Sequence, residues 1–390
     1  MDDLLLLDEQ LTDDERMIRD TVSRFVSSEV LPLMTQAFEQ ATFPRELIKK
    51  SAELGLLGLT LPSQYGGAEA SYVAYGLVCQ ELERGDSGLR SFVSVQNSLC
   101  MYPIFHYGSE AQKKRFLVKM AKGNLIGCFG LTEPDSGSDP GSMRTYAKKV
   151  EGGWRLNGSK MWITNATIAD IAIVWAKTEH GIRAFIVEKE FPGFDRHEIT
   201  LKMSLRASIT GELKFEDVFV PEDNLLPGTE RGLSTALGCL SQARYGIAWG
   251  AMGAAMACFD ITRDYLLARK QFDKPLASFQ LIQKDLAEMY TEIVKAQCIH
   301  LQIGRLKDLK QETSVMISLA KGNACREALK IARTCRNLLG ANGISLEYHV
   351  IRHMLNLESV FTYEGTDNVH TLVLGRHITG INAFVSNSRT

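Results

Sequence analysis

"GWRLNGSKMWIT", residues 153–164, decides the fold of the chain together with three further short runs of the same kind. These runs are "IADIAIVWAKT" (168–178), "RAFIVEKE" (183–190) and "GELKFEDVFVP" (211–221). Each is rich in β-branched and aromatic residues and is bounded by Gly, Asn, Asp or Pro, which is typical of strands. The Asn-Gly pair inside "RLNGSK" (155–160) predicts a tight hairpin turn. We therefore expect a small β-domain over residues 126–235.

Long helical patterns flank this β-domain on both sides. Before it, "LTDDERMIRDTVSRFVSSEVLPL" (11–33) has apolar residues on one helical face, and "SEAQKKRFLVKMAKG" (109–123) starts at a Ser cap and stops at a glycine. After it, three long amphipathic runs follow with short breaks, which predicts an antiparallel bundle. The expected class is α+β multidomain, with a helical domain over 1–125 and a four-helix-bundle-like domain over 236–390.

Composition excludes several classes of function. The 390 residues carry a formal net charge of −2, so a basic nucleic-acid footprint is not expected. No apolar run approaches the roughly 18 residues of a membrane span. The acidic start "MDDLLLLDEQLTDDERM" lacks the features of signal and transit peptides. We expect a cytoplasmic protein, or a protein of the mitochondrial matrix whose leader has been removed.

Metal and disulfide sites are not expected either. The eight cysteines form no C-x-x-C pair and lie mostly in apolar helical contexts, which favours small buried side chains in a reducing compartment. His349 and His353 are the only His pair at helical spacing, and no carboxylate or Cys ligand accompanies them in the sequence. We expect a structural role for both histidines.

Two segments of the β-domain have the chemistry of a cofactor site, although neither common dinucleotide fingerprint is present. The loop in "CFGLTEPDSGSDPGSM" (128–143) offers backbone N–H groups and hydroxyls that suit a diphosphate, or it is an ordinary Ser/Gly turn. In "KMWITNA" (160–166), Trp162 and Thr164 would face one side of a strand. They would suit a flat heteroaromatic ligand, unless Trp162 belongs to the core.

An acid stands between an aromatic run and a helix start in "TYEGTDNVHTLVLGR" (362–376). Thr366 or Asp367 caps the predicted helix, whose Val369, Leu372 and Val373 form an apolar face. Glu364 lies in the preceding loop, and a half-buried carboxyl there would have a raised pKa and could transfer protons.

The chain resembles the acyl-CoA dehydrogenase family over nearly its whole length. The segments that carry the resemblance, in family order, are "GLTEPDSGSD", "WITN", "ARYGIAWG", "ARKQFDKPL", "LLGANGIS" and "YEGT". Within the family it is most similar to the glutaryl-CoA dehydrogenases, through "ERGDSGLRSFVSVQNSL", "SLRASITG" and "EYHVIRHMLNLE". The resemblance implies bound FAD, a homotetramer whose flavin sites use two subunits, and electron transfer flavoprotein as the electron acceptor.

The resemblance also implies roles for individual residues. Glu364 matches the catalytic base, and its N–H, with a flavin ribityl hydroxyl, would hold the thioester oxygen. Residues at family positions for FAD are Phe129, Leu131, Thr132, Gly137, Ser138, Trp162, Ile163, Thr164, Arg269, Gln271, Phe272, Asn337, Gly340, Thr366 and Asn368. Of these, Arg269, Gln271 and Phe272 would reach the FAD of a neighbouring subunit. Asn337 and Asn368 depart from the family's usual Gln.

Substrate positions follow in the same way. Ser241 and Arg244 fall at the CoA side, and Tyr363 and Gly365 fall at the thioester end. Arg90 falls in the acyl pocket, where a guanidinium suits the terminal carboxylate of a dicarboxylic acyl group. Glu83 would orient Arg90, and Ser94 would add a hydrogen bond. The alternative from the residues alone is a surface pair between Arg90 and Asp86.

The expected function is FAD-dependent oxidation of glutaryl-CoA by α-proton abstraction and β-hydride transfer, followed by decarboxylation to crotonyl-CoA. The neighbouring Tyr363 agrees with the decarboxylating type. Three alternatives stay open: formation of glutaconyl-CoA without decarboxylation, a short-chain acyl-CoA dehydrogenase, and a catalytically silent helical protein. Glu364, Thr132, Ser138, Trp162 and Thr164 are all present, which disfavours the silent protein.

Overall fold

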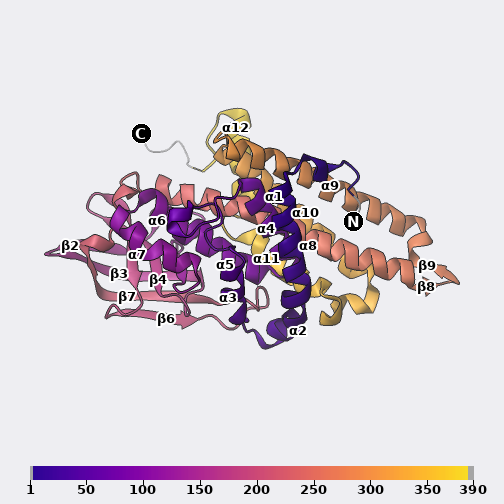
Figure 1. Cartoon of the computed structure of the whole chain (residues 1–390), viewed down its shortest axis with the longest axis horizontal. Coiled ribbons are helices and arrows are strands. Elements are labelled where there is room, and N and C mark those ends of the chain that lie inside the picture. Colours follow the sequence, from indigo (N-terminus) through magenta and orange to yellow (C-terminus); the bar gives the residue numbers. More distant parts are fainter. Residues whose placement is uncertain (1–2, 385–390) are drawn as a thin grey trace.

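The computed structural model describes residues 3–384, and its first part is helical (Figure 1). Helix α1 begins at Asp13 because Thr12 and Glu15 form a capping box, in which each side chain bonds the other's backbone N–H. A Ser109–Gln112 capping box likewise starts α7. The helices of this part are α1 (Asp13–Phe25), α2 (Leu31–Gln40), α3 (Glu46–Glu53), α4 (Tyr72–Gly85), α5 (Ser87–Ser94), α6 (Tyr102–Tyr107) and α7 (Glu110–Ala121).

A seven-stranded sheet follows, with strand order β1-β4-β2-β3-β7-β6 and β5 paired to β4. Strands β1 and β2 run parallel to β4, and the remaining pairs are antiparallel. All four strand-like runs of the sequence are strands. The bounds are β1 (Gly127–Gly130), β2 (Tyr146–Val150), β3 (Gly153–Thr164), β4 (Ile171–Thr178), β5 (Gly181–Glu188), β6 (Phe194–Glu198) and β7 (Thr210–Pro221).

The hairpin turn predicted at Asn157-Gly158 is wrong. Both residues lie inside β3, and the chain turns between β2 and β3 at Glu151-Gly152, where Gly152 has φ 74°. Gly158 instead marks a shift in the register of β3 against β7, with φ 137°. A Cβ at this position would lie 2.5 Å from Thr145 Oγ1, so the glycine allows a close approach of two strands rather than a turn.

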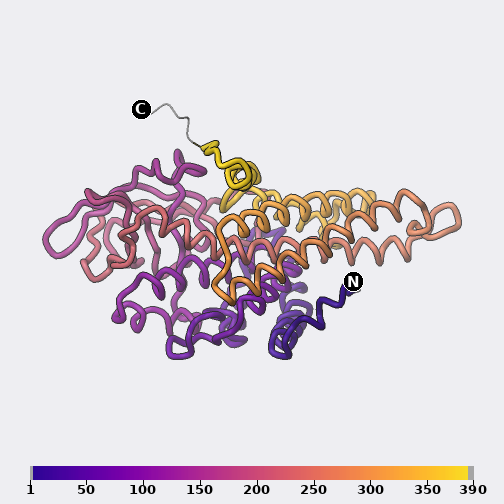
Figure 2. Tube along the Cα trace, turned by 90° about the horizontal axis from the view of Figure 1, so that it is seen from above, coloured from indigo at the N-terminus to yellow at the C-terminus, as the bar shows by residue number. Residues whose placement is uncertain are grey.

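The last part of the chain is a helical bundle, and α8 and α9 extend from it to a small hairpin far from the sheet (Figures 1 and 2). Helix α8 packs closely on α4 because it is rich in small residues; a Cβ at Gly253 would lie 2.0 Å from the carbonyl oxygen of Gln80. The elements are α8 (Leu233–Ala268), β8 (Lys270–Gln271), β9 (Lys274–Pro275), α9 (Gln280–Asp308), α10 (Ser314–Leu338), α11 (Val350–Thr362) and α12 (Asp367–Thr379).

The face predicted to bury α12 is only partly correct. Helix α12 lies against α10, but Leu372 is 36% exposed, and His370 is the one buried residue of the helix. Both ring nitrogens of His370 are buried, and neither has a hydrogen-bond partner within residues 3–384; burial lowers the pKa of His370 to about 3. The imidazole of His370, which packs against Gly365 of the Glu364 loop, is therefore neutral.

The cysteines are free thiols, and all except the partly exposed Cys298 are buried. Burial raises the pKa of Cys79, Cys128 and Cys335 to about 12 and that of Cys325 to about 11. The prediction of small buried side chains is confirmed for these thiols.

Candidate active site

The loop Tyr363-Glu364-Gly365 joins α11 to α12 at the centre of the candidate site. Thr366 caps α12 by accepting a hydrogen bond from the Val369 N–H at 3.2 Å, which confirms the first of the two predicted caps. Glu364 has φ 49° and Gly365 has φ 97°, both in the left-handed region. A Cβ at Gly365 would lie 2.7 Å from His370 Nε2, so the turn needs glycine there.

The Glu364 side chain is partly buried. Its Oε2 is buried and has no hydrogen-bond partner among the described residues. Burial raises the pKa of Glu364 to about 7, and the positive charges of Arg244, Arg90 and Lys321 oppose that rise. The raised pKa expected from the sequence is confirmed. Near neutral pH the group can both take up and release a proton.

Two cations hold the backbone of this loop. Arg244 Nε donates a hydrogen bond to the Glu364 carbonyl at 2.6 Å, and Lys321 Nζ donates to the carbonyls of Tyr363 and Gly365 at 2.8 and 2.7 Å. Sequence reasoning missed Lys321. A signal was available, because Lys321 falls within the apolar stripe of α10 that includes Ile317 and Ala324 at helical spacing.

A buried ion pair lies next to the loop, where α4 and α5 meet. Arg90 is 1% exposed and Glu83 is fully buried, and Arg90 Nε donates to Glu83 Oε2. Arg90 Nη2 donates to the Tyr363 hydroxyl, which lies 3.4 Å from Ser91 Oγ. No hydrogen bond from Arg90 Nη1 is made within residues 3–384. The geometry leaves one edge of the guanidinium for another acceptor.

The alternative pairing of Arg90 with Asp86 is wrong. Asp86 caps α5 through the Gly88 N–H at 2.6 Å, and its Oδ2 accepts hydrogen bonds from Arg352 and Asn356 of α11. Asp86 and Arg352 are both fully buried. This ion pair fixes the start of α5, the helix that carries Arg90, against α11.

The charges of the cluster are not balanced when Glu364 is ionised. Arg90, Arg244 and Lys321 are cations that act on the same carboxyl group, and the carboxylates of the cluster are Glu364 and Glu83. One more negative charge would neutralise this interior.

The predicted substrate serines occupy different environments. Ser94 is 1% exposed, and its Oγ has no hydrogen-bond partner among the described residues. Ser241 donates to the Leu237 carbonyl of its own helix α8 at 3.1 Å. Ser91, which sequence reasoning did not single out, is the serine beside Tyr363; as the residue next to Arg90 on a helix, it had no separate signal.

The β-domain presents an exposed indole at the end of β3. Trp162 is 57% exposed, with φ 62°, where the register of β3 against β7 shifts between Lys160 and Ile163. The alternative of a core Trp162 is wrong. The shift also interrupts the regular alternation on which a common side for Trp162 and Thr164 was expected. Ile163 is buried beside the exposed indole.

The loop after β1 is closed by a buried carboxylate. Glu133 accepts hydrogen bonds from the backbone N–H groups of Arg144 and Thr145 and from Lys160 Nζ, the last at 2.8 Å. This leaves Gly137 and Ser138 exposed at the tip, while Thr132 is partly exposed and Phe129 and Leu131 are buried. The Met161 N–H donates to the Thr132 carbonyl at 2.9 Å, so this loop lies beside the end of β3. An exposed indole on a left-handed backbone, beside hydroxyl groups and a Gly/Ser loop, fits the flat rings and diphosphate of FAD.

The remaining predicted cofactor residues lie elsewhere on the chain. Arg269, Gln271 and Phe272 are exposed on the β8–β9 hairpin, at the opposite end of the molecule from β2 and β3 (Figure 1). Phe272 is 87% exposed, and Phe272 and Asp273 both have positive φ, as a two-residue hairpin turn requires. One copy of the chain therefore does not bring these residues to Trp162.

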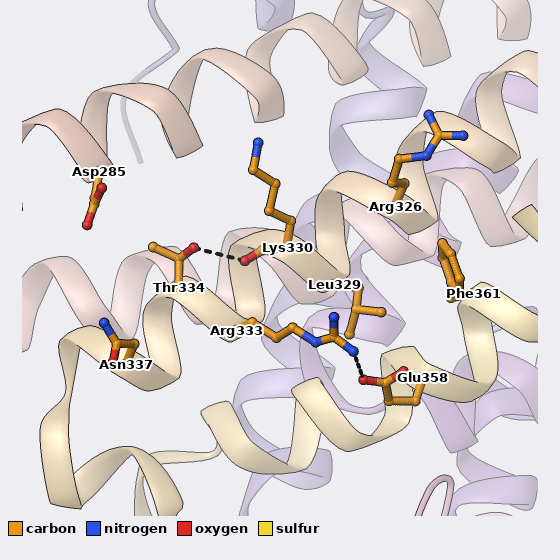
Figure 3. Close-up of a pocket in the computed structure, with 9 residues that line it drawn as sticks. All are labelled: Asp285, Arg326, Leu329, Lys330, Arg333, Thr334, Asn337, Glu358 and Phe361. Atoms are coloured by element: carbon orange, nitrogen blue, oxygen red, sulfur yellow. Dashed lines mark hydrogen bonds and ion pairs between the residues drawn. The ribbon is translucent and has the colours of Figure 1, made fainter.

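A groove of about 550 Å³ runs between α9, α10 and α11 (Figure 3). Asn337 lies at one end of it and Phe361 at the other, and Arg333 pairs with Glu358 along one side (Figure 3). Lys330 of α10 adds a further cation to the lining. Gly340 and Asn368 are exposed outside this lining, and Thr366 is partly exposed.

Two classes of site find no support in the described residues. Within residues 3–384 no group of His, Cys, Asp or Glu side chains could hold a metal ion. Among the helices of the same residues, none is both long enough and apolar enough to cross a membrane.

Three family models together match most of the chain. The N-terminal domain of acyl-CoA dehydrogenase matches residues 12–124, the middle domain 128–218 and the C-terminal domain 230–379. A short-chain specific acyl-CoA dehydrogenase of Clostridium acetobutylicum is 35% identical over 379 residues, which are 95% of this chain and 100% of that protein.

Solved structures of the same family superpose closely. A glutaryl-CoA dehydrogenase of Mycobacterium smegmatis is 50% identical with a TM-score of 0.97, covering 98% of this chain and 99% of that one, and another of its structures holds FADH2. A butyryl-CoA dehydrogenase of Megasphaera elsdenii is 35% identical with a TM-score of 0.91, covering 94% and 98%. The chain therefore belongs to the acyl-CoA dehydrogenase family, and it is an FAD-dependent enzyme of that family.

Proposed function

We propose that the enzyme oxidises glutaryl-CoA and decarboxylates the product to crotonyl-CoA. The observation that carries this proposal is the buried Arg90 beside the loop of Glu364. Its Nη2 donates to the Tyr363 hydroxyl, and its Nη1 has no hydrogen-bond partner among the described residues. A monocarboxylic acyl chain would leave Nη1 of this guanidinium desolvated without an acceptor, whereas the terminal carboxylate of a dicarboxylic one supplies that acceptor and a further negative charge. The 50% identity to a glutaryl-CoA dehydrogenase supports the same substrate.

Glu364 is the proposed catalytic base. It removes the α-proton of the thioester, and its pKa of about 7 suits this step because a stronger base than an ordinary carboxylate is needed. The negative charge that develops on the thioester oxygen needs a donor. No described residue accepts a hydrogen bond from the Glu364 N–H, so this group is available for that oxygen. FAD held beside the substrate would supply the acceptor for the β-hydrogen, which leaves as hydride.

Decarboxylation then uses the same residues. Oxidation places a double bond between the α- and β-carbons, and the terminal carboxylate leaves as CO2 with its bonding electrons delocalised to the thioester oxygen. Protonated Glu364 returns its proton to the γ-carbon, which gives crotonyl-CoA. The pKa of about 7 allows this second transfer at neutral pH. Arg90 and Tyr363 orient the carboxylate until it leaves.

The proposed cofactor site combines two copies of the chain. Trp162, Thr164 and the Thr132–Ser138 loop would hold the flavin and diphosphate, while the exposed Arg269, Gln271 and Phe272 of another copy would complete the adenosine end. The exposure of that hairpin, far from Trp162, supports a homotetramer. Electron transfer flavoprotein is the proposed electron acceptor.

The experiment is anaerobic mixing of the purified enzyme with glutaryl-CoA, following flavin bleaching and identifying the product by mass. Crotonyl-CoA and CO2 are expected. The variant Arg90→Ala should lose about 10²-fold or more in kcat/KM for glutaryl-CoA, since a charge-assisted bidentate pair is lost, and far less for butyryl-CoA. Equal losses for both substrates would remove Arg90 from the carboxylate role.

Two alternative functions are each open to a specific test. The similarity to a short-chain specific enzyme and to a butyryl-CoA dehydrogenase supports oxidation of short monocarboxylic thioesters; faster turnover of butyryl-CoA than of glutaryl-CoA would establish it. Glutaconyl-CoA as the end product would establish a non-decarboxylating enzyme with the same Arg90 contact.

A further inference from the structure

Lys321 is a buried cation that the mechanism above does not use. It is fully buried in the middle of α10, and within residues 3–384 it forms no ion pair with a carboxylate. Its hydrogen bonds go to two backbone carbonyls, those of Tyr363 and Gly365, which flank the proposed base. Burying an ammonium group without a paired carboxylate is costly. The two carbonyls supply its hydrogen bonds, and the Tyr363 ring, 5.9 Å away, and the nearby Glu364 carboxyl group add electrostatic stabilisation.

The geometry of the peptide unit gives this contact a consequence. The Tyr363 carbonyl and the Glu364 N–H belong to one planar, trans peptide group and point in opposite directions. A carbonyl held at 2.8 Å by Lys321 therefore aims the Glu364 N–H away from α10. That N–H has no protein acceptor, as noted above. The positive charge on the carbonyl side also polarises the peptide and strengthens the N–H as a donor.

We propose that Lys321 is a positioning residue for the oxyanion site, which aims and polarises the Glu364 N–H toward the thioester oxygen. The inference rests on the proposed function of Glu364 but not on the acyl group that the enzyme takes. Arg244, on the Glu364 carbonyl at 2.6 Å, fixes the next peptide unit of the same loop. The buried Lys321 and the partly buried Arg244 thus fix three consecutive carbonyls. They hold Glu364 in its left-handed conformation, which residues other than Gly adopt at a cost.

Lys321→Met tests the proposal, because Met keeps the length of the side chain and removes its charge and donors. The first readout is the infrared carbonyl stretch of a bound thioester labelled with 13C at the carbonyl. Glutaryl and butyryl thioester analogues with sulfur in place of the β-methylene have no β-hydrogen to lose. In a Glu364→Gln background they also keep their α-proton, so the carbonyl reports the ground-state contact without turnover. In the variant, the stretch should shift back toward its frequency in water for both analogues.

The kinetic readout is a split between kcat and KM. Loss of the aimed donor should lower kcat by about 10- to 10²-fold, below the 10²- to 10³-fold that deletion of an oxyanion donor costs, with KM changed less than about threefold. Lys307→Met is the matched control, since Lys307 is also a buried lysine, on α9, but bonds Glu312. It should keep the wild-type stretch and kcat.

A pH profile adds a readout that a purely structural role would not move. Glu364 faces Arg244 from α8, Arg90 from α5, Lys321 from α10 and the neutral His370 from α12. Removing the charge of Lys321 raises the pKa of Glu364, so the ascending limb of kcat/KM should move to higher pH.

A wild-type carbonyl stretch in Lys321→Met, or equal kcat losses in it and in Lys307→Met, would overturn the proposal. If Lys321→Met does not retain flavin, Lys321→Gln keeps a neutral donor. Its stretch should lie between the wild-type frequency and the frequency in water, and a wild-type frequency there also contradicts the proposal. Failure of the proposed function has a different signature: an active Glu364→Gln enzyme, or wild-type enzyme whose flavin glutaryl-CoA does not bleach.

Discussion

The kcat/KM of the enzyme should fall tenfold per pH unit below neutrality. The pKa of Glu364 is raised from 4.5 to about 7, and only the ionised carboxylate can remove the α-proton. At pH 6 about one enzyme in ten is then active, and at pH 5 about one in a hundred. A glutamate with the ordinary pKa of 4.5 would be almost fully ionised at pH 6 and would show no loss.

The assay is anaerobic flavin bleaching at substrate concentrations below KM, from pH 5.5 to 9. Under these conditions the rate reports kcat/KM, and therefore the ionisation of the free enzyme to which the pKa refers. Butyryl-CoA is the control substrate, because its acyl group does not titrate in this range. A flat profile between pH 5.5 and 8, or a midpoint below pH 5.5 with both substrates, would refute the assignment of Glu364 as a desolvated base.

A charge deletion tests the cause of the shift. Arg244 is the cation that lowers the pKa of Glu364 most, and an opposite charge nearby is worth about one unit or more. Arg244→Met should therefore move the ascending limb up by about one unit. Arg115→Met is the control. It removes an exposed arginine of α7 that pairs with Glu188 of β5, and it should leave the midpoint of the pH profile unchanged. A downward shift in Arg244→Met would contradict the electrostatic account.

Three further outcomes are expected. Arg352→Met should lower the free energy of unfolding by about 3–5 kcal/mol, read by urea denaturation, because it leaves the Asp86 carboxylate buried and unpaired; adding Asp86→Asn should restore part of the loss. Gly365→Ala should lower kcat about 10-fold or more, since φ is 97° and the new Cβ would crowd His370; wild-type kcat would show that the loop adapts. Phe272→Ala should weaken FAD binding about 2- to 10-fold in a fluorescence titration, and unchanged affinity would remove the hairpin from the cofactor site.

Local signals predicted the main strands and helices but not the whole sheet. The four runs with β-branched and aromatic residues are strands: the pattern of β7 alternates between buried and exposed residues, whereas β4 and most of β5 are continuously buried. Strands β2 and β6, "YAKKV" and "FDRHE", were missed. They are short and highly charged, and their neighbours β3 and β7 impose their extended state. The Asn-Gly pair misled because a close approach of two strands also requires glycine.

Parts of the candidate site were predictable from the sequence where a residue type in its local context indicates one chemical role. A carboxyl in an aromatic loop indicated Glu364, whereas the role of Arg90 came from the family resemblance, because the residues alone left a pair with Asp86 open. The Tyr363 hydroxyl on Arg90 was not foreseen, because the two residues are 273 positions apart and nothing local encodes their distance. Lys321 was missed for the opposite reason: its interruption of an apolar stripe was visible in the sequence, but its partners are backbone carbonyls, which have no sequence signature.

The distribution of buried and exposed thiols allows one cysteine of the folded protein to be labelled selectively. Seven cysteines are buried, and Cys298 on α9 is the partly exposed one. A maleimide reagent applied to the folded protein should therefore attach mainly at Cys298, because reaction requires access and a thiolate, and burial denies both to the others. A dye placed there would sit on α9 without any mutation, between the buried Ala296 and His300 rather than at the exposed β8–β9 hairpin. It would report on changes around this part of the bundle.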